Sequence, residues 1–170
     1  MEATTLKLET LSYSNVKTYL VTTLFVIGNI ALPQLFHLVP DGGITFLPLY
    51  FFTLIAAYKY GCKAGLLVAV LSPLVNHLLF GMPSLAVLPA ILLKSGLLAV
   101  AAGLAANYFK RISILILVGV VLSYQIIGTL GEWMIEGNFY TAIQDFRIAI
   151  PGMLLQVVGG YAVIKYLIYK

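Results

Sequence analysis

Long apolar runs constrain the fold of this chain more than any other feature of its sequence. Each run approaches the 20 or so apolar residues that a helix needs to cross a bilayer core. Charged residues or clusters of Pro and Gly separate one run from the next. Only 9% of the residues are charged, against about 25% in an average soluble domain. The chain has too little polar surface for a soluble globule, so we predict an integral membrane protein.

Six membrane spans would account for most of the 170 residues. The apolar runs are continuous rather than alternating, so each span is predicted to be a helix and not a barrel strand. The predicted spans cover residues 17–39, 44–58, 64–80, 85–109, 112–135 and 146–168. Residues 1–16 form a cytoplasmic or interfacial N-terminal lead-in. The predicted fold is a single six-helix transmembrane domain over residues 17–170.

The positions of the basic residues predict the orientation. With six spans, both termini lie on one side of the membrane, and that side collects Lys7, Lys17, Lys59, Lys63, Lys110, Arg111, Lys165 and Lys170. The other side receives only Arg147, near an interface. Cytoplasmic loops carry an excess of Lys and Arg, so both termini are predicted to be cytoplasmic. In a membrane protein the net charge of +4 is less informative than the positions of the charges, and no nucleic-acid partner is expected.

Lys94 is the most informative polar residue because it falls inside the fourth span. It lies nine residues beyond Leu85, or about 13 Å along a helix that rises about 1.5 Å per residue. A lysine near the bilayer centre costs about 2.5–3.5 kcal/mol to insert. Two interpretations remain open. Lys94 either snorkels or pairs with Glu132 as a structural element, or it faces a solvated cavity that binds an anion.

Further polar residues gather at the predicted outer ends of the spans. With Lys94 they form a candidate substrate-binding set that consists of His37, Asn76, His77, Glu132, Trp133, Asp145 and Arg147. Each alone is better explained as an interfacial side chain, and Trp133 especially fits the aromatic belt of a membrane protein. Their shared location instead predicts one pocket that opens outward.

Small residues recur in the inner halves of the third and fourth spans. The third span carries Gly65 and Ala69, and the fourth carries Ala99 and Gly103. Small residues four apart let helices approach closely. They predict either ordinary packing within the bundle or a flat face on which a membrane partner docks.

Several catalytic signatures are missing from the sequence. It contains no GK[ST] phosphate loop, no HExxH, no zinc-ligand spacing and no GxSxG elbow. Cys62 is the single cysteine, so no multi-cysteine metal site can form. The sequence therefore predicts no enzymatic activity, no metal site and no cofactor.

A stretch from Phe46 to about Ala106 contains Leu47-Pro48, Tyr60-Gly61, Ser72-Pro73-Leu74 and the run Leu79-Phe80-Gly81-Met82-Pro83. Through these motifs, the central third of the chain resembles the S components of energy-coupling-factor (ECF) vitamin transporters. The LLFGMP run after SPL is its most specific part. An alanine- and glycine-rich span follows, and the length and six-span layout of the chain also fit.

The resemblance implies a function as well as a fold. S components bind a water-soluble vitamin or precursor from outside a prokaryotic cell membrane, at a site in their outer half. They associate with a membrane scaffold subunit and two cytoplasmic ATPases. Family members often dock the scaffold through Ala-xxx-Ala in the first helix, where this chain has Thr18 and Thr22. With Lys94 in the pocket, the expected substrate is anionic.

Two other functions fit the composition. A six-span scaffold of the cell-shape type would need no outward pocket and would retain no small molecule. A membrane enzyme acting on lipid-linked substrates would need acid and base groups at the interface, for which Asp41 and Asp145 are the available residues.

Overall fold

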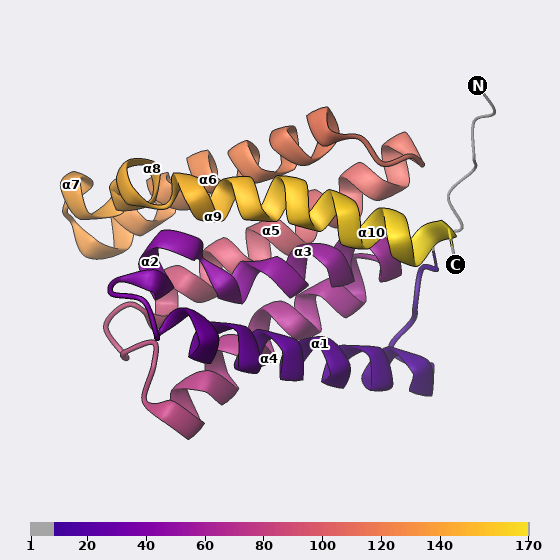
Figure 1. Ribbon diagram of the computed structural model, residues 1–170, viewed down its shortest axis with the longest axis horizontal. Coiled ribbons are helices and arrows are strands. Elements are labelled where there is room, and N and C mark those ends of the chain that lie inside the picture. The colour runs from indigo at the N-terminus through magenta and orange to yellow at the C-terminus, as the bar shows by residue number, and fades with distance from the viewer. Residues whose placement is uncertain (1–8, 170) are drawn as a thin grey trace.

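The computed structural model describes residues 9–169, and all regular structure in that range is helical. The helices pack side by side in one bundle (Figure 1). In chain order they are α1 (Val16–Phe36), α2 (Gly42–Phe46), α3 (Pro48–Tyr60), α4 (Cys62–Phe80), α5 (Leu88–Phe109), α6 (Ile114–Glu136), α7 (Phe139–Ala142), α8 (Gln144–Ile148), α9 (Ile150–Leu154), the π-helical segment Leu155–Gly159 and α10 (Gly160–Tyr169). Residues 1–8, half of the predicted N-terminal lead-in, lie outside the described residues.

Six stretches are long and apolar enough to cross a membrane. They are α1, α2 with α3, α4, α5, α6, and Ile150–Leu167, which includes α9, the π-helical segment and most of α10. The predicted all-helical chain with six potential spans is thus confirmed. The predicted bounds were wrong at the start of two spans. The fourth begins at Leu88 rather than residue 85, and the sixth begins at Ile150 rather than residue 146.

The sequence analysis treated the second span as one continuous helix, but the structure breaks it near its start. Leu47 separates α2 from α3 and adopts a left-handed conformation with φ 47°. Pro48 follows it as the first residue of α3. A residue before proline is disfavoured in the right-handed helical region, whereas proline itself suits the first helical position. The Leu47-Pro48 pair therefore ends α2 and starts α3.

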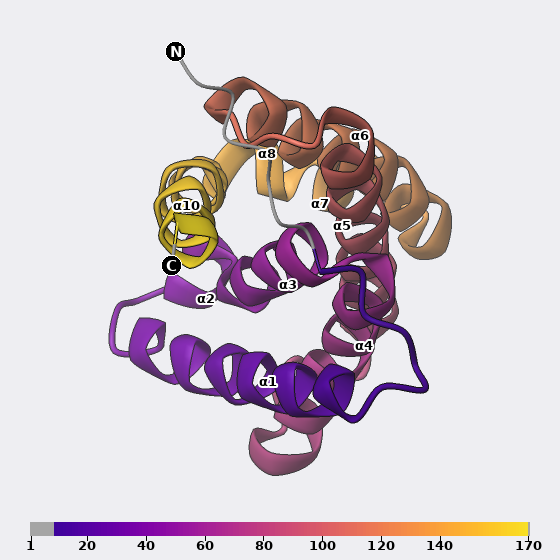
Figure 2. The ribbon, with the colours of Figure 1, turned by 90° about the vertical axis from the view of Figure 1, so that its right-hand side faces the viewer.

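The third helix, α3, occupies the centre of the bundle. It contacts α1, α4, α5 and α10, and the end-on view in Figure 2 shows these helices around it. The consecutive residues Leu54–Tyr58 are all fully buried. A helix that is apolar and buried on every side must be surrounded by other helices. This explains why the shortest predicted span carries the core of the fold.

All six residues predicted for partner docking are buried within the chain: Thr18, Thr22, Gly65, Ala69, Ala99 and Gly103. A Cβ at Gly65 would lie 2.7 Å from the Ala57 Cα atom, and one at Gly103 would lie 2.9 Å from the Cys62 backbone nitrogen. Glycine is required at both positions because helix backbones meet there. These small residues close the bundle, and in the isolated chain they form no exposed face.

The two ends of the bundle differ in the segments they hold. We call the end where α1 begins and α10 finishes the terminal end (Figure 1). We call the opposite end the cavity end, because the cavity described below opens there. The turns at Gly61 and at residues 110–113 lie at the terminal end. Asn15 caps α1 there by accepting a hydrogen bond from the Lys17 backbone N–H at 2.9 Å. The connection from α4 to α5 and the short helices α7 and α8 lie at the cavity end.

The predicted orientation can be tested by cysteine labelling in a Cys62→Ala background. Ser84→Cys lies at the cavity end, Ser14→Cys lies at the terminal end, and both positions are exposed. Because the basic residues favour a cytoplasmic terminal end, a membrane-impermeant maleimide should label Ser84→Cys in intact cells. It should label Ser14→Cys only after permeabilisation. The reverse pattern would contradict the orientation.

Candidate functional site

A cavity of about 720 Å³ opens at the cavity end of the bundle. That size falls within the range of about 300–1,000 Å³ that is usual for small-molecule pockets. Two groups of segments form its wall. The first is the end of α1, the segment through α2 and the start of α3. The second is the α4–α5 connection, the first turns of α5, the end of α6 and α8. The polar residues of the wall are Gln34, His37, Asp41, Tyr50, Asn76, Ser84, Lys94, Glu132, Gln144 and Asp145.

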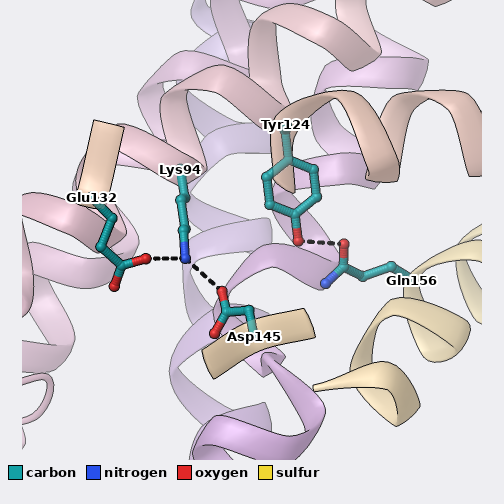
Figure 3. Close-up of polar contacts among 5 residues, drawn as sticks. All are labelled: Lys94, Tyr124, Glu132, Asp145 and Gln156. Carbon is teal, nitrogen blue, oxygen red and sulfur yellow. Dashed lines mark hydrogen bonds and ion pairs between the residues drawn. The ribbon is translucent and has the colours of Figure 1, made fainter. Parts of the chain in front are cut away.

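Lys94 lies at the side of this cavity, between two carboxylates. Its Nζ atom lies 2.7 Å from Oδ2 of Asp145 on α8 and also contacts Oε2 of Glu132 on α6 (Figure 3). The residue is only 2% exposed. The sequence analysis weighed Glu132 as a partner for Lys94; the structure adds Asp145. We call Lys94, Glu132 and Asp145 the charge cluster.

Lys94 is closer to the N-terminal start of its helix than the sequence analysis expected. The α5 helix begins at Leu88, so Lys94 is six residues, or about 9 Å, from its start. The preceding residues form a turn in which the Val87 and Leu88 N–H groups donate to Ser84 O. The ammonium therefore lies in the third of α5 that is nearest the cavity end, where carboxylates from that end can reach it.

Glycine on α6 makes room for the lysine side chain. A Cβ atom at Gly128 would lie 2.6 Å from Cγ of Lys94 and 3.5 Å from its Cδ and Cε atoms. Glu132 follows Gly128 by four residues, which places both on the same face of α6. Lys94 can thus extend along α6 past Gly128 and reach Glu132 one turn further on.

Asn76 is fixed at the cavity wall by a buried network that joins three helices. Its Nδ2 atom donates to Asn29 O at 3.0 Å and to Ser72 O at 3.1 Å. The Asn29 amide donates in turn to Thr53 Oγ1 and Ser72 Oγ and accepts from the Phe52 N–H. Buried polar groups that are mutually hydrogen-bonded hold one specific arrangement. The network therefore fixes α1, α3 and α4 together at the cavity.

A pair of neutral polar side chains lies beside the charge cluster. The Tyr124 hydroxyl donates to Oε1 of Gln156 at 3.0 Å, and both residues are fully buried (Figure 3). Gln156 belongs to the π-helical segment. Tyr50, which lines the cavity, packs its ring against Tyr124 with centroids 5.6 Å apart. The Tyr50 and Tyr124 rings thus connect the cavity wall to this pair.

Five of the eight residues predicted for substrate binding line the cavity: His37, Asn76, Lys94, Glu132 and Asp145. The other three do not. Nδ1 of His77 is hydrogen-bonded with Pro83 O at 2.8 Å, Trp133 packs against Phe139, and the Arg147 guanidinium lies 4.1 Å from the Tyr140 ring centroid.

The predicted substrate-binding set lacked five of the polar wall residues: Gln34, Asp41, Tyr50, Ser84 and Gln144. Tyr50 belongs to an otherwise apolar run, and Ser84 lies in a turn, so neither carried a signal of its own. Among residues 9–169, no three His, Cys, Asp or Glu side chains gather in a way that could hold a metal ion.

Comparison of the chain with family models, with curated proteins and with solved structures finds no match.

Proposed function

We propose that this chain is the substrate-capture subunit of an ECF-type importer, binding a water-soluble vitamin or precursor in the cavity. The observation that carries the proposal is a cavity of about 720 Å³ that is lined by charged side chains and lies at one end of a bundle with six potential membrane spans. Charged residues within membrane-spanning helices are costly and commonly mark substrate sites. The cavity draws on residues that lie far apart in the chain, and its volume is usual for a small-molecule site.

The resemblance to S components adds the partners to the proposal. The chain has no phosphate loop with which to hydrolyse ATP. Import against a gradient would therefore need a membrane scaffold subunit and two cytoplasmic ATPases. The cell membrane of a prokaryote is the proposed location, with the cavity end facing outward. In this proposal the chain binds and presents its substrate and catalyses no reaction.

A cavity-filling variant tests the capture function. Ala90 lines the cavity and is 2% exposed, so Ala90→Phe should occupy part of the binding volume. Small molecules released by denaturing the purified chain should be detected by mass spectrometry for the wild type and be lost for Ala90→Phe. Val100→Phe, on the exposed side of the same helix, is the matched control and should retain the compound.

Three results would contradict the proposal. A wild-type chain that releases no small molecule would favour the structural-scaffold alternative. A compound retained equally by Ala90→Phe would not be bound in this cavity. Accumulation of a vitamin in liposomes that contain the chain alone, without ATP or partner subunits, would contradict the proposed role as an importer subunit.

A further inference from the structure

We propose that the cavity selects a ligand with a net positive charge, whose cationic nitrogen is held by Asp145 and Glu132. This inference rests on the proposed function, because it presumes that the cavity captures a small molecule. It narrows the ligand to a cationic small molecule, whereas the sequence analysis expected an anionic substrate from Lys94 alone. The argument depends on the charges that line the cavity, on which of them a ligand can reach and on how they are paired.

The wall of the cavity carries more negative than positive charge. Its acidic and basic side chains are Asp41, Lys94, Glu132 and Asp145, together with His37. With His37 neutral, one ammonium faces three carboxylates, so the wall has a net charge of −2. The charge cluster alone has a net charge of −1, since Lys94 contacts two carboxylates. An unbalanced charge at this depth is costly, and a bound cation would offset it.

The carboxylates are also the reachable members of the charge cluster. The Lys94 side chain is 3% exposed, whereas the side chains of Glu132 and Asp145 are each 15% exposed. A lysine ammonium has three N–H donors, and two carboxylates already contact it here. An entering anion would therefore meet two carboxylates before the ammonium and would be repelled by both. A cation would be attracted by the same two groups.

Among residues 9–169, no Lys or Arg other than Lys94 lines the cavity. Arg147 follows Asp145 by only two residues, but its guanidinium stacks on the Tyr140 ring and it does not line the cavity. Tyr50 contributes an aromatic ring to the wall. Aromatic faces attract cations, so this ring favours the same charge on the ligand.

Retention from a mixture tests the charge of the ligand directly. The purified full-length chain would be incubated with the small-molecule fraction of a host-cell lysate, supplemented with an equimolar set of water-soluble vitamins. Retained compounds would then be identified by mass spectrometry after washing. We expect compounds with a net positive charge at pH 7. A retained compound that is neutral or anionic would overturn the inference and leave the capture function standing. Retention of nothing would overturn both.

Carboxylate variants locate the interaction. Asp145→Asn keeps the shape of the side chain and leaves Lys94 its contact with Glu132, so the chain should stay folded while affinity for the retained cation falls at least tenfold. Glu136→Gln removes a carboxylate near the end of α6 that does not line the cavity, and its affinity should not change. Unchanged affinity in a folded Asp145→Asn variant would overturn the inference.

A second variant covers the case in which Asp145→Asn fails to fold. Asp41 lines the cavity and is exposed, so Asp41→Asn should leave the fold intact. It removes one of the three carboxylates of the wall and should weaken binding of the retained cation several-fold. An affinity equal to that of the wild type would contradict the proposed role of the cavity charge.

Discussion

Replacing Lys94 with methionine should destabilise the chain by about 3–5 kcal/mol, the range for leaving a buried charge without its partner. Lys94 is the only cation of the charge cluster. Without it, the carboxylates of Glu132 and Asp145 would face each other in a largely buried site. For a domain of this size, such a loss lowers the melting temperature by about 6–20 °C. Thermal unfolding of the purified variant in detergent measures the effect.

Neutralising the carboxylates should reverse much of this loss. The triple variant Lys94→Met, Glu132→Gln, Asp145→Asn removes all three charges and should recover most of the melting temperature. Lys63→Met serves as the matched control, because Lys63 is exposed and contacts the Tyr13 ring. This variant should have the melting temperature of the wild type. A wild-type melting temperature for Lys94→Met alone would show that Lys94 does not balance the two carboxylates.

Adding a single methyl group at Gly103 should destabilise the bundle by about 3 kcal/mol. A Cβ at this position would lie within 3 Å of the N, Cα and Cβ atoms of Cys62, at the start of α4. Backbone atoms cannot move aside as a flexible side chain can, so α4 and α5 would have to separate. Overpacking in close-packed interiors costs about 1–3 kcal/mol and occasionally more. The melting temperature of Gly103→Ala measures the cost.

Gly96→Ala is the control on the same helix. Nothing lies within 4 Å of a Cβ at Gly96, and alanine is favoured over glycine within a helix by about 1 kcal/mol. This variant should be as stable as the wild type or slightly more so. If Gly96→Ala and Gly103→Ala melted alike, the close approach of α4 and α5 at Cys62 would be wrong.

The number and type of the spans could be predicted because the lipid environment imposes a simple length rule. Each span needs about 20 apolar residues, and the breaks fall at charges or at proline and glycine. The bounds were less predictable. Leu85–Val87 are apolar enough to read as helix, yet they belong to a turn before Leu88. Hydropathy does not distinguish an apolar turn from an apolar helix.

The charge cluster was only partly predictable. Lys94 could be found because a lysine within an apolar run is rare, and Glu132 followed as the acid in a neighbouring span. Asp145 was expected at the same end of the bundle, but nothing in the sequence indicates that α8 brings it to Lys94. That contact depends on where the short helices α7 and α8 lie after the end of α6. Their placement is a property of tertiary packing.

The small residues illustrate a different limit. Spacing alone cannot tell a face that packs within the chain from one that meets a partner, since both need a close approach of helices. The structure buries Gly65 against Ala57 and Gly103 against Cys62. Only the arrangement of α3, α4 and α5 decides between the two interpretations for these residues.

The central claim is that a small molecule occupies the cavity at the end of the bundle. The most direct test is an experimental structure of the chain purified from its host membranes without added ligand. The proposal predicts non-protein density in the cavity, beside the carboxylates of Asp145 and Glu132, and the absence of that density in Ala90→Phe. A cavity that contains only water, or one that has closed, would contradict the capture function.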